Sequence, residues 1–107
     1  MPTMADDLFE AIEQTDVDRL RRLLDSGADV GESRDGWTPL HHAVDIEVDS
    51  AAQTGGALHV DVTALLVARG ADPLSPDTQG VTPLESAESR GHWLAAEVMR
   101  ALLSRRT

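Results

Sequence analysis

Two short motifs recur in phase along this sequence, and that repetition constrains the fold more than any other feature. One motif consists of Thr38, Pro39 and Leu40, repeated as Thr82, Pro83 and Leu84. The other consists of Gly27, Ala28 and Asp29, repeated as Gly70, Ala71 and Asp72. An internal repeat of this kind is typical of architectures in which each unit packs only on its neighbours.

Each motif fits one end of a helix. A threonine hydroxyl can cap the first turn, and proline is tolerated at the next position because the N–H it lacks would be unpaired there. Glu85 completes a capping box with Thr82. Glycine is favoured just past a helix end, where the backbone turns left-handed. The motifs therefore predict where helices start and stop.

The apolar spacing between these motifs predicts three pairs of helices, in units of about 5–34, 35–77 and 78–107. We expect residues 1–5 to be a loose lead-in and one outer helix to run from about His59 to Arg69. The second unit is longer than the first, and its excess matches 47–57, which we interpret as an insertion between its two helices. This insertion is either a binding loop or a tolerated extension.

Composition narrows the class of protein. Hydrophobic residues make up 41% of the 107 residues and aromatic residues only 3%, which favours closely packed helices with a core of Leu, Ala and Val. The absence of cysteine, of a long apolar run and of a signal-peptide pattern makes a cytoplasmic protein our expectation. The net charge is −10, with 13 acidic residues and 4 arginines in residues 1–50. Nucleic acid and membrane are unfavourable partners for such a chain, whereas a basic protein surface is favoured.

These motifs resemble the hallmark of the ankyrin repeat family, Thr-Pro-Leu-His, which is complete at 38–41 and carries Glu85 in place of His in the later copy. The resemblance implies an all-α solenoid of helix-turn-helix units joined by β-turns. It also implies that His41 bonds to the backbone of a neighbouring turn, which makes this residue structural.

No motif for catalysis or cofactor binding is present. The chain lacks a nucleophile elbow and a glycine-rich phosphate loop. Its four histidines, His41, His42, His59 and His92, show no metal-ligand spacing. We expect a non-enzymatic protein with no cofactor and no metal.

In ankyrin proteins the turn tips and inner helices line a protein-binding groove. Carried over by position, the exposed groove candidates are Glu10, Glu13, Gln14, Glu32, Arg34, Trp37, His42, Asp45, Ile46, Val81, Ser89 and Arg90. Trp37 is either an interface residue or a cover for its own turn. We expect Trp93 to pack over the core.

The sequence thus predicts a protein-binding module, and as one concrete role a stoichiometric inhibitor or immunity protein against a basic partner. A scaffold or weakly homodimeric subunit is an alternative. So is a metal- or small-molecule-responsive regulator that uses His42, Asp45 and Glu47.

Overall fold

The computed structural model describes residues 3–105, and helix caps divide this part of the chain as the motifs predict. The helices are α1 (Met4–Glu13), α2 (Val17–Asp25), α3 (Pro39–Thr54), α4 (Asp61–Ala68), α5 (Pro83–Ser89) and α6 (Trp93–Arg105). Thr38 caps α3, and Thr82 caps α5 in a capping box with Glu85. Pro39 and Pro83 occupy the first helical positions.

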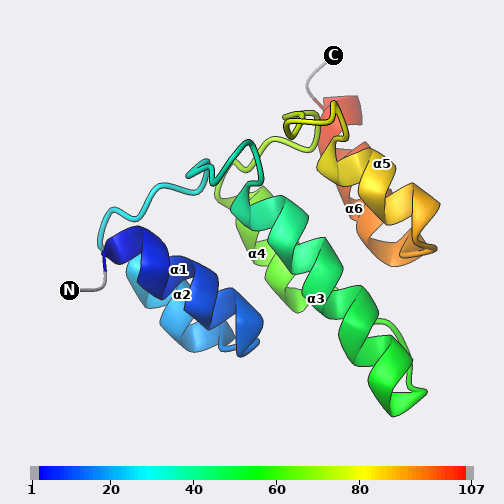
Figure 1. Ribbon diagram of the computed structural model, residues 1–107, viewed down its shortest axis with the longest axis horizontal. Coiled ribbons are helices and arrows are strands. Elements are labelled where there is room, and N and C mark those ends of the chain that lie inside the picture. Colours follow the sequence, from blue (N-terminus) through cyan, green and yellow to red (C-terminus); the bar gives the residue numbers. More distant parts are fainter. Residues whose placement is uncertain (1–2, 106–107) are drawn as a thin grey trace.

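The helices form two layers. In Figure 1, α1, α3 and α5 lie side by side as an inner layer, and α2, α4 and α6 lie behind them as an outer layer. Each inner helix packs on the outer helix that follows it in the sequence, so the molecule is a short all-α stack of three helix pairs. Within the described residues, no helix has the length and apolar character needed to cross a membrane.

The core runs between the two layers and consists almost entirely of aliphatic side chains. Its largest fully buried members are Leu8, Ile12, Leu20, Leu40, Val44, Val62, Leu66 and Met99. Small residues such as Ala43, Ala87 and Ala95 lie between them and let the helices approach closely. This composition agrees with the low aromatic content of the sequence.

His41 links the second unit to the third. Its Nε2 donates to the carbonyl oxygen of Val81 at 2.8 Å, and its Nδ1 accepts from the backbone N–H of Thr38 at 3.1 Å. Both ring nitrogens are therefore used in the buried joint between two successive turns. This arrangement confirms the structural role that the family resemblance assigned to His41.

The interpretation of 47–57 as a separate inserted segment between helices is wrong. Residues 47–54 continue α3 without a break, and the helix ends only where Gly55 adopts the left-handed conformation, with φ of +64°. The extra residues lengthen the inner helix because nothing before Gly55 interrupts its backbone hydrogen bonding. Glu47 is fully buried, so it belongs to the core.

Two helix boundaries also differ from expectation. Residues 1–5 were expected to be a loose lead-in, but α1 begins at Met4, capped by Thr3 in a capping box with Asp6. Residues 1–2 lie outside the described part. The expected helix at His59–Arg69 begins instead at Asp61. Residues 106–107 of the third unit also lie outside the described part.

Candidate protein-binding face

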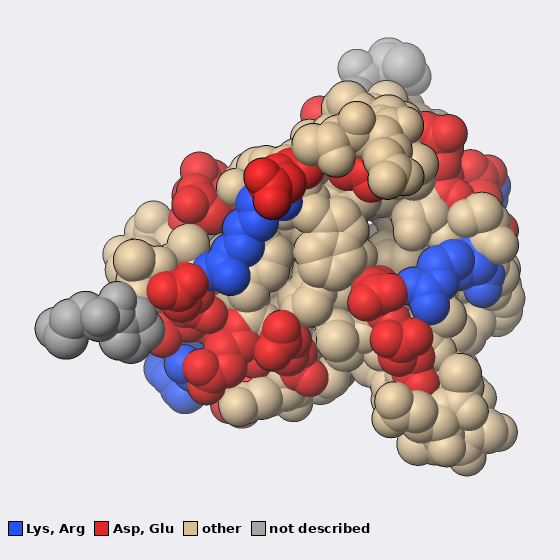
Figure 2. All heavy atoms as spheres, in the orientation of Figure 1, with Lys and Arg blue, Asp and Glu red and all other residues tan. Residues whose placement is uncertain are grey.

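Four of the groove candidates, from α1, the 34–37 turn, α3 and the residue after α5, lie on one surface, linked by contacts to His42 or to one another. We call it the inner face and define it by Glu13 on α1, Trp37 in the turn, Asp45 on α3 and Arg90 after α5. Figure 2 shows acidic side chains over α1 and along α3, with uncharged atoms and a basic side chain between them. The inner face therefore has acidic margins on its α1 and α3 sides.

An aromatic cluster around His42 lies within the inner face. Trp37 meets the ring of His42 edge-on with a centroid distance of 4.7 Å, and Phe9 lies 5.6 Å from the same ring. The Arg34 guanidinium lies 4.4 Å above the Phe9 ring. Trp37 is held against His42 while part of its surface stays open.

His42 is buried, which contradicts its predicted exposure in the groove. Only 7% of the residue is accessible, because Phe9 and Trp37 enclose its ring. Its Nε2 lies 3.3 Å from Glu13 Oε1 but outside hydrogen-bonding geometry, and neither ring nitrogen has a hydrogen-bond partner within residues 3–105. His42 therefore supports the inner face from beneath.

Burial lowers the pKa of the His42 imidazole, and Arg34 acts in the same direction, whereas Glu13 and Asp45 oppose the shift. In the unfolded chain His42 gains its proton near its ordinary pKa of about 6.5, while in the folded chain the proton binds only at lower pH. Acid should therefore favour the unfolded state through this residue.

We expect the free energy of unfolding to fall as the pH drops from about 7.5 through about 6, and His42→Gln to make this fall shallower. Urea unfolding of the natural protein and of His42→Gln across this pH range measures how steeply the free energy of unfolding changes with pH in each. A variant that loses stability as steeply as the natural sequence would show that His42 does not contribute.

The arginines of the inner face already neutralise part of its acidity. Arg34 pairs with Asp6, and Arg90 pairs with Asp45 and, at 3.1 Å, with Asp49. Glu13 faces His42 rather than an arginine, and 58% of its side chain is exposed. Together with Glu13, these pairs comprise four carboxylates and two guanidinium groups, a formal excess of two negative charges.

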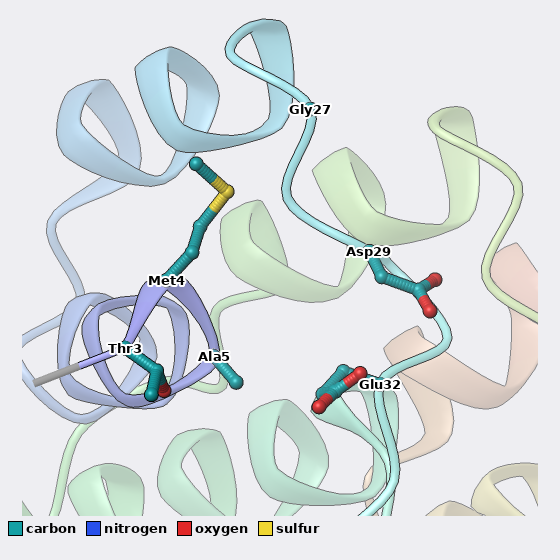
Figure 3. Close-up of a pocket in the computed structure, with 6 residues that line it drawn as sticks. All are labelled: Thr3, Met4, Ala5, Gly27, Asp29 and Glu32. Carbon is teal, nitrogen blue, oxygen red and sulfur yellow. The ribbon is translucent and has the colours of Figure 1, made fainter.

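The remaining candidates do not all join the inner face. Glu10 turns toward the outer layer, where Arg19 binds it at 3.0 Å. Glu32 lines an open depression of about 370 Å³ at the start of α1, and Figure 3 shows its carboxyl group pointing toward Ala5 while Asp29 points away. Val81 and Ser89 line a separate shallow surface near Glu85. Gln14 is exposed, whereas Ile46 is partly buried against the core.

The prediction that Trp93 packs over the core is wrong, because 61% of it is exposed. It is the first residue of α6, and its neighbours Ala95, Ala96 and Met99 make the buried contacts. These three positions face inward, whereas Trp93, at the first position of the helix, lies to the side of this buried face.

A polar network missed by the sequence reasoning lies in the core. Glu47 Oε1 accepts from Thr63 Oγ1 at 2.7 Å and from His92 Nε2 at 2.8 Å, and its Oε2 accepts from the Thr63 N–H at 3.1 Å. Val60 supplies no side-chain cap for α4, so Glu47 of α3 caps that helix from outside. Glu47 faces this network while His42 lies with Phe9 and Trp37, so the proposed trio of His42, Asp45 and Glu47 does not form one site.

Comparison with known proteins agrees with this architecture. A mouse 2-5A-dependent ribonuclease is 41% identical over 78 residues, which cover 71% of this chain and 9% of the ribonuclease. A putative ankyrin repeat protein of Rickettsia bellii is 30% identical, and the match covers 79% of this chain and 61% of the Rickettsia protein. The human and mouse ribonucleases each share only about a tenth of their length with this chain. The crystal structure of an ankyrin repeat domain from Acinetobacter baumannii superimposes with a TM-score of 0.72 and 30% identity, covering 89% of this chain and 46% of that one. Residues 8–107 match the family model for ankyrin repeats in three copies, so the chain belongs to the ankyrin repeat family.

Proposed function

We propose that the inner face binds a protein that presents a basic surface, with Trp37 as the central contact. Ankyrin repeats are in general non-catalytic modules that bind other proteins. The observation that carries the proposal is the arrangement of Trp37: its ring is fixed against His42 and partly open, and Glu13 lies 3.3 Å from the same His42 ring.

A fixed aromatic side chain is well suited to binding. Its conformational entropy is already lost in the free protein, so a partner does not have to order it. Tryptophan is also enriched among the residues that dominate binding energy at protein interfaces. The buried His42 ring beneath Trp37 and the Phe9 ring behind it give this contact a rigid support.

The acidic margins favour lysine or arginine on the partner. Glu13 is exposed beside the aromatic cluster and lies 3.3 Å from His42, whose pKa is lowered by burial, so the imidazole does not offset the Glu13 charge near pH 7. A basic side chain of the partner that lies over Trp37 would meet both the ring face and the Glu13 carboxylate. The narrower proposal is a stoichiometric inhibitor or immunity protein that covers a basic partner.

A second candidate function is self-association as a scaffold subunit. Trp93 is 61% exposed and Leu74 is 50% exposed, and neither is part of the inner face. Light scattering at rising concentration tests this candidate. A dimer that Trp93→Ala converts to a monomer would support it, and a monomer at all concentrations would exclude it.

Trp37→Ala tests the proposed binding face, and Trp93→Ala is its matched control. A partner recovered from the native host with the natural protein should bind Trp37→Ala at least about 30-fold more weakly, the loss of about 2 kcal/mol expected at the centre of an interface. Calorimetric titration of the purified pair measures this change. Trp93→Ala removes a side chain of the same size from another surface, so this variant should bind the partner with unchanged affinity.

The same titration in about 0.05 M and 0.5 M salt tests the basic-surface component, because salt screens attraction between exposed charges. We expect the affinity to fall with salt and Glu13→Gln to reduce this dependence. Equal binding by Trp37→Ala and the natural protein would refute the proposed face. An affinity that does not change with salt would refute the basic character of the partner surface but not the proposed binding face.

A further inference from the structure

The geometry points to a binding site for a divalent transition-metal ion formed by Glu47, His59 and Asp61. These three residues each place one ligand atom so that all three atoms lie within 4.8 Å of one another. They come from α3, from the connector before α4 and from the first position of α4. The site is separate from the inner face and does not depend on the function proposed for it.

Glu47 is the fixed member of the site. It is fully buried, and its carboxylate is oriented by Thr63 and His92. Oε1 accepts two hydrogen bonds and Oε2 accepts one, the Thr63 N–H at 3.1 Å. Because a carboxylate oxygen has two acceptor positions, Oε2 retains one for a ligand. Neighbours that orient a metal-binding carboxylate in this way are a usual feature of metal sites.

His59 and Asp61 form the open side of the site. His59 Nδ1 lies 2.8 Å from Asp61 Oδ1, so the two side chains already face one another. They are 33% and 52% exposed, which gives an ion a path from solvent. Exposed side chains change conformation more easily than the buried Glu47, so His59 and Asp61 would move toward a bound ion and cover it from the solvent side.

One imidazole and two carboxylates suit Zn²⁺ among the common divalent ions. Ligand atoms around a tetrahedral zinc ion are about 3.4 Å apart, since each lies about 2.1 Å from the metal. The present separations do not exceed 4.8 Å, so each needs to close by at most about 1.4 Å, which the two exposed side chains can supply. Three protein ligands leave the fourth position for water.

Binding would tie the connector between α3 and α4 to the core. This connector follows the lengthened end of α3 and has no regular structure until α4 begins at Asp61. An ion held by Glu47 and His59 would join its last residues to the buried network. Of the trio named for the alternative metal- or small-molecule-responsive regulator, only Glu47 belongs to this site, and His59 and Asp61 take the places of His42 and Asp45.

Isothermal titration of the untagged protein with ZnCl₂, after treatment with chelator, tests the site directly. We expect one ion per chain, with affinity reduced at least about 10-fold by His59→Ala and by Asp61→Asn. Asp18→Asn on α2 is the matched control, because it removes the same charge from an exposed carboxylate in another unit. It should bind zinc as the natural protein does.

Thermal unfolding supplies a second readout. Zinc in excess should raise the melting temperature of the natural protein and of Asp18→Asn by equal amounts, and that of His59→Ala by less. Cobalt(II) spectra should show one bound ion, and His59→Ala should change its spectrum and weaken its binding. No heat with zinc, or unchanged binding by both His59→Ala and Asp61→Asn, would overturn the site. Loss of binding in Asp18→Asn would overturn it as well.

Discussion

Replacing Glu47 with alanine should lower the free energy of unfolding by about 4 kcal/mol, measured by urea unfolding in the presence of a chelator. The Glu47 carboxylate accepts hydrogen bonds from the Thr63 N–H, the Thr63 hydroxyl and His92 Nε2. Each buried donor left unpaired costs about 1–3 kcal/mol, part of which water entering the vacated space recovers. The loss is a large fraction of the roughly 5–15 kcal/mol expected for a small domain.

Asp49→Ala provides the matched control on the same helix. Asp49 lies two residues further along α3, is 51% exposed and pairs with Arg90 at the surface. Exposed ion pairs contribute at most about 1 kcal/mol, so this variant should stay close to the natural protein. Equal stability losses for the two variants would show that the Glu47 network does not hold α3, α4 and the start of α6 together.

Glu47→Gln separates the shape of the side chain from its acceptors. A glutamine can present one oxygen to Thr63 Oγ1 and His92, but its amide nitrogen would then meet the Thr63 N–H as a second donor. We expect a loss between those of the alanine variant and the control. The expected loss of unfolding free energy is therefore largest for Glu47→Ala, intermediate for Glu47→Gln and smallest for Asp49→Ala, because Glu47 caps α4 and Asp49 does not.

The sequence predicted the repeated parts of the fold because their signals are local. The Thr38 and Thr82 caps, the prolines after them and the glycine turns act within one helix end, and short-range chemistry determines each of them. The bond from His41 to Val81 followed from the family resemblance. The Glu47 network could not be predicted in this way, since its partners Thr63 and His92 are 16 and 45 residues away.

The candidate site was predicted only in part for a related reason. Position in a repeat indicates which helix face a residue occupies, but not whether a larger neighbour covers it. His42 occupies an inner-helix position, yet Trp37 and Phe9 enclose it. A run of acidic and small residues at 47–54 likewise suggested a separate segment, although no glycine or proline stands before Gly55 to end the helix.

Gly36→Ala should lower the free energy of unfolding by about 3 kcal/mol, and the reason lies in how successive turns pack. Gly36 has a φ of +79°, where a side chain costs about 1 kcal/mol. A Cβ atom there would lie 2.8 Å from the backbone nitrogen of Thr78 and 3.0 Å from the Asp77 Cα. Backbone atoms of the next turn would have to shift, which costs about 1–3 kcal/mol more.

Gly80 isolates the packing component, because it has a similar φ of +80° in the next turn and a Cβ atom added there would have no heavy atom within 4 Å. Gly80→Ala should therefore cost only the backbone component, about 1 kcal/mol. Urea unfolding of both variants gives the difference of about 2 kcal/mol that the contact between turns contributes. Equal losses would mean that the turns of the second and third units can separate freely. A larger loss at Gly36 would show that the stack is held at its turns as well as between its helices.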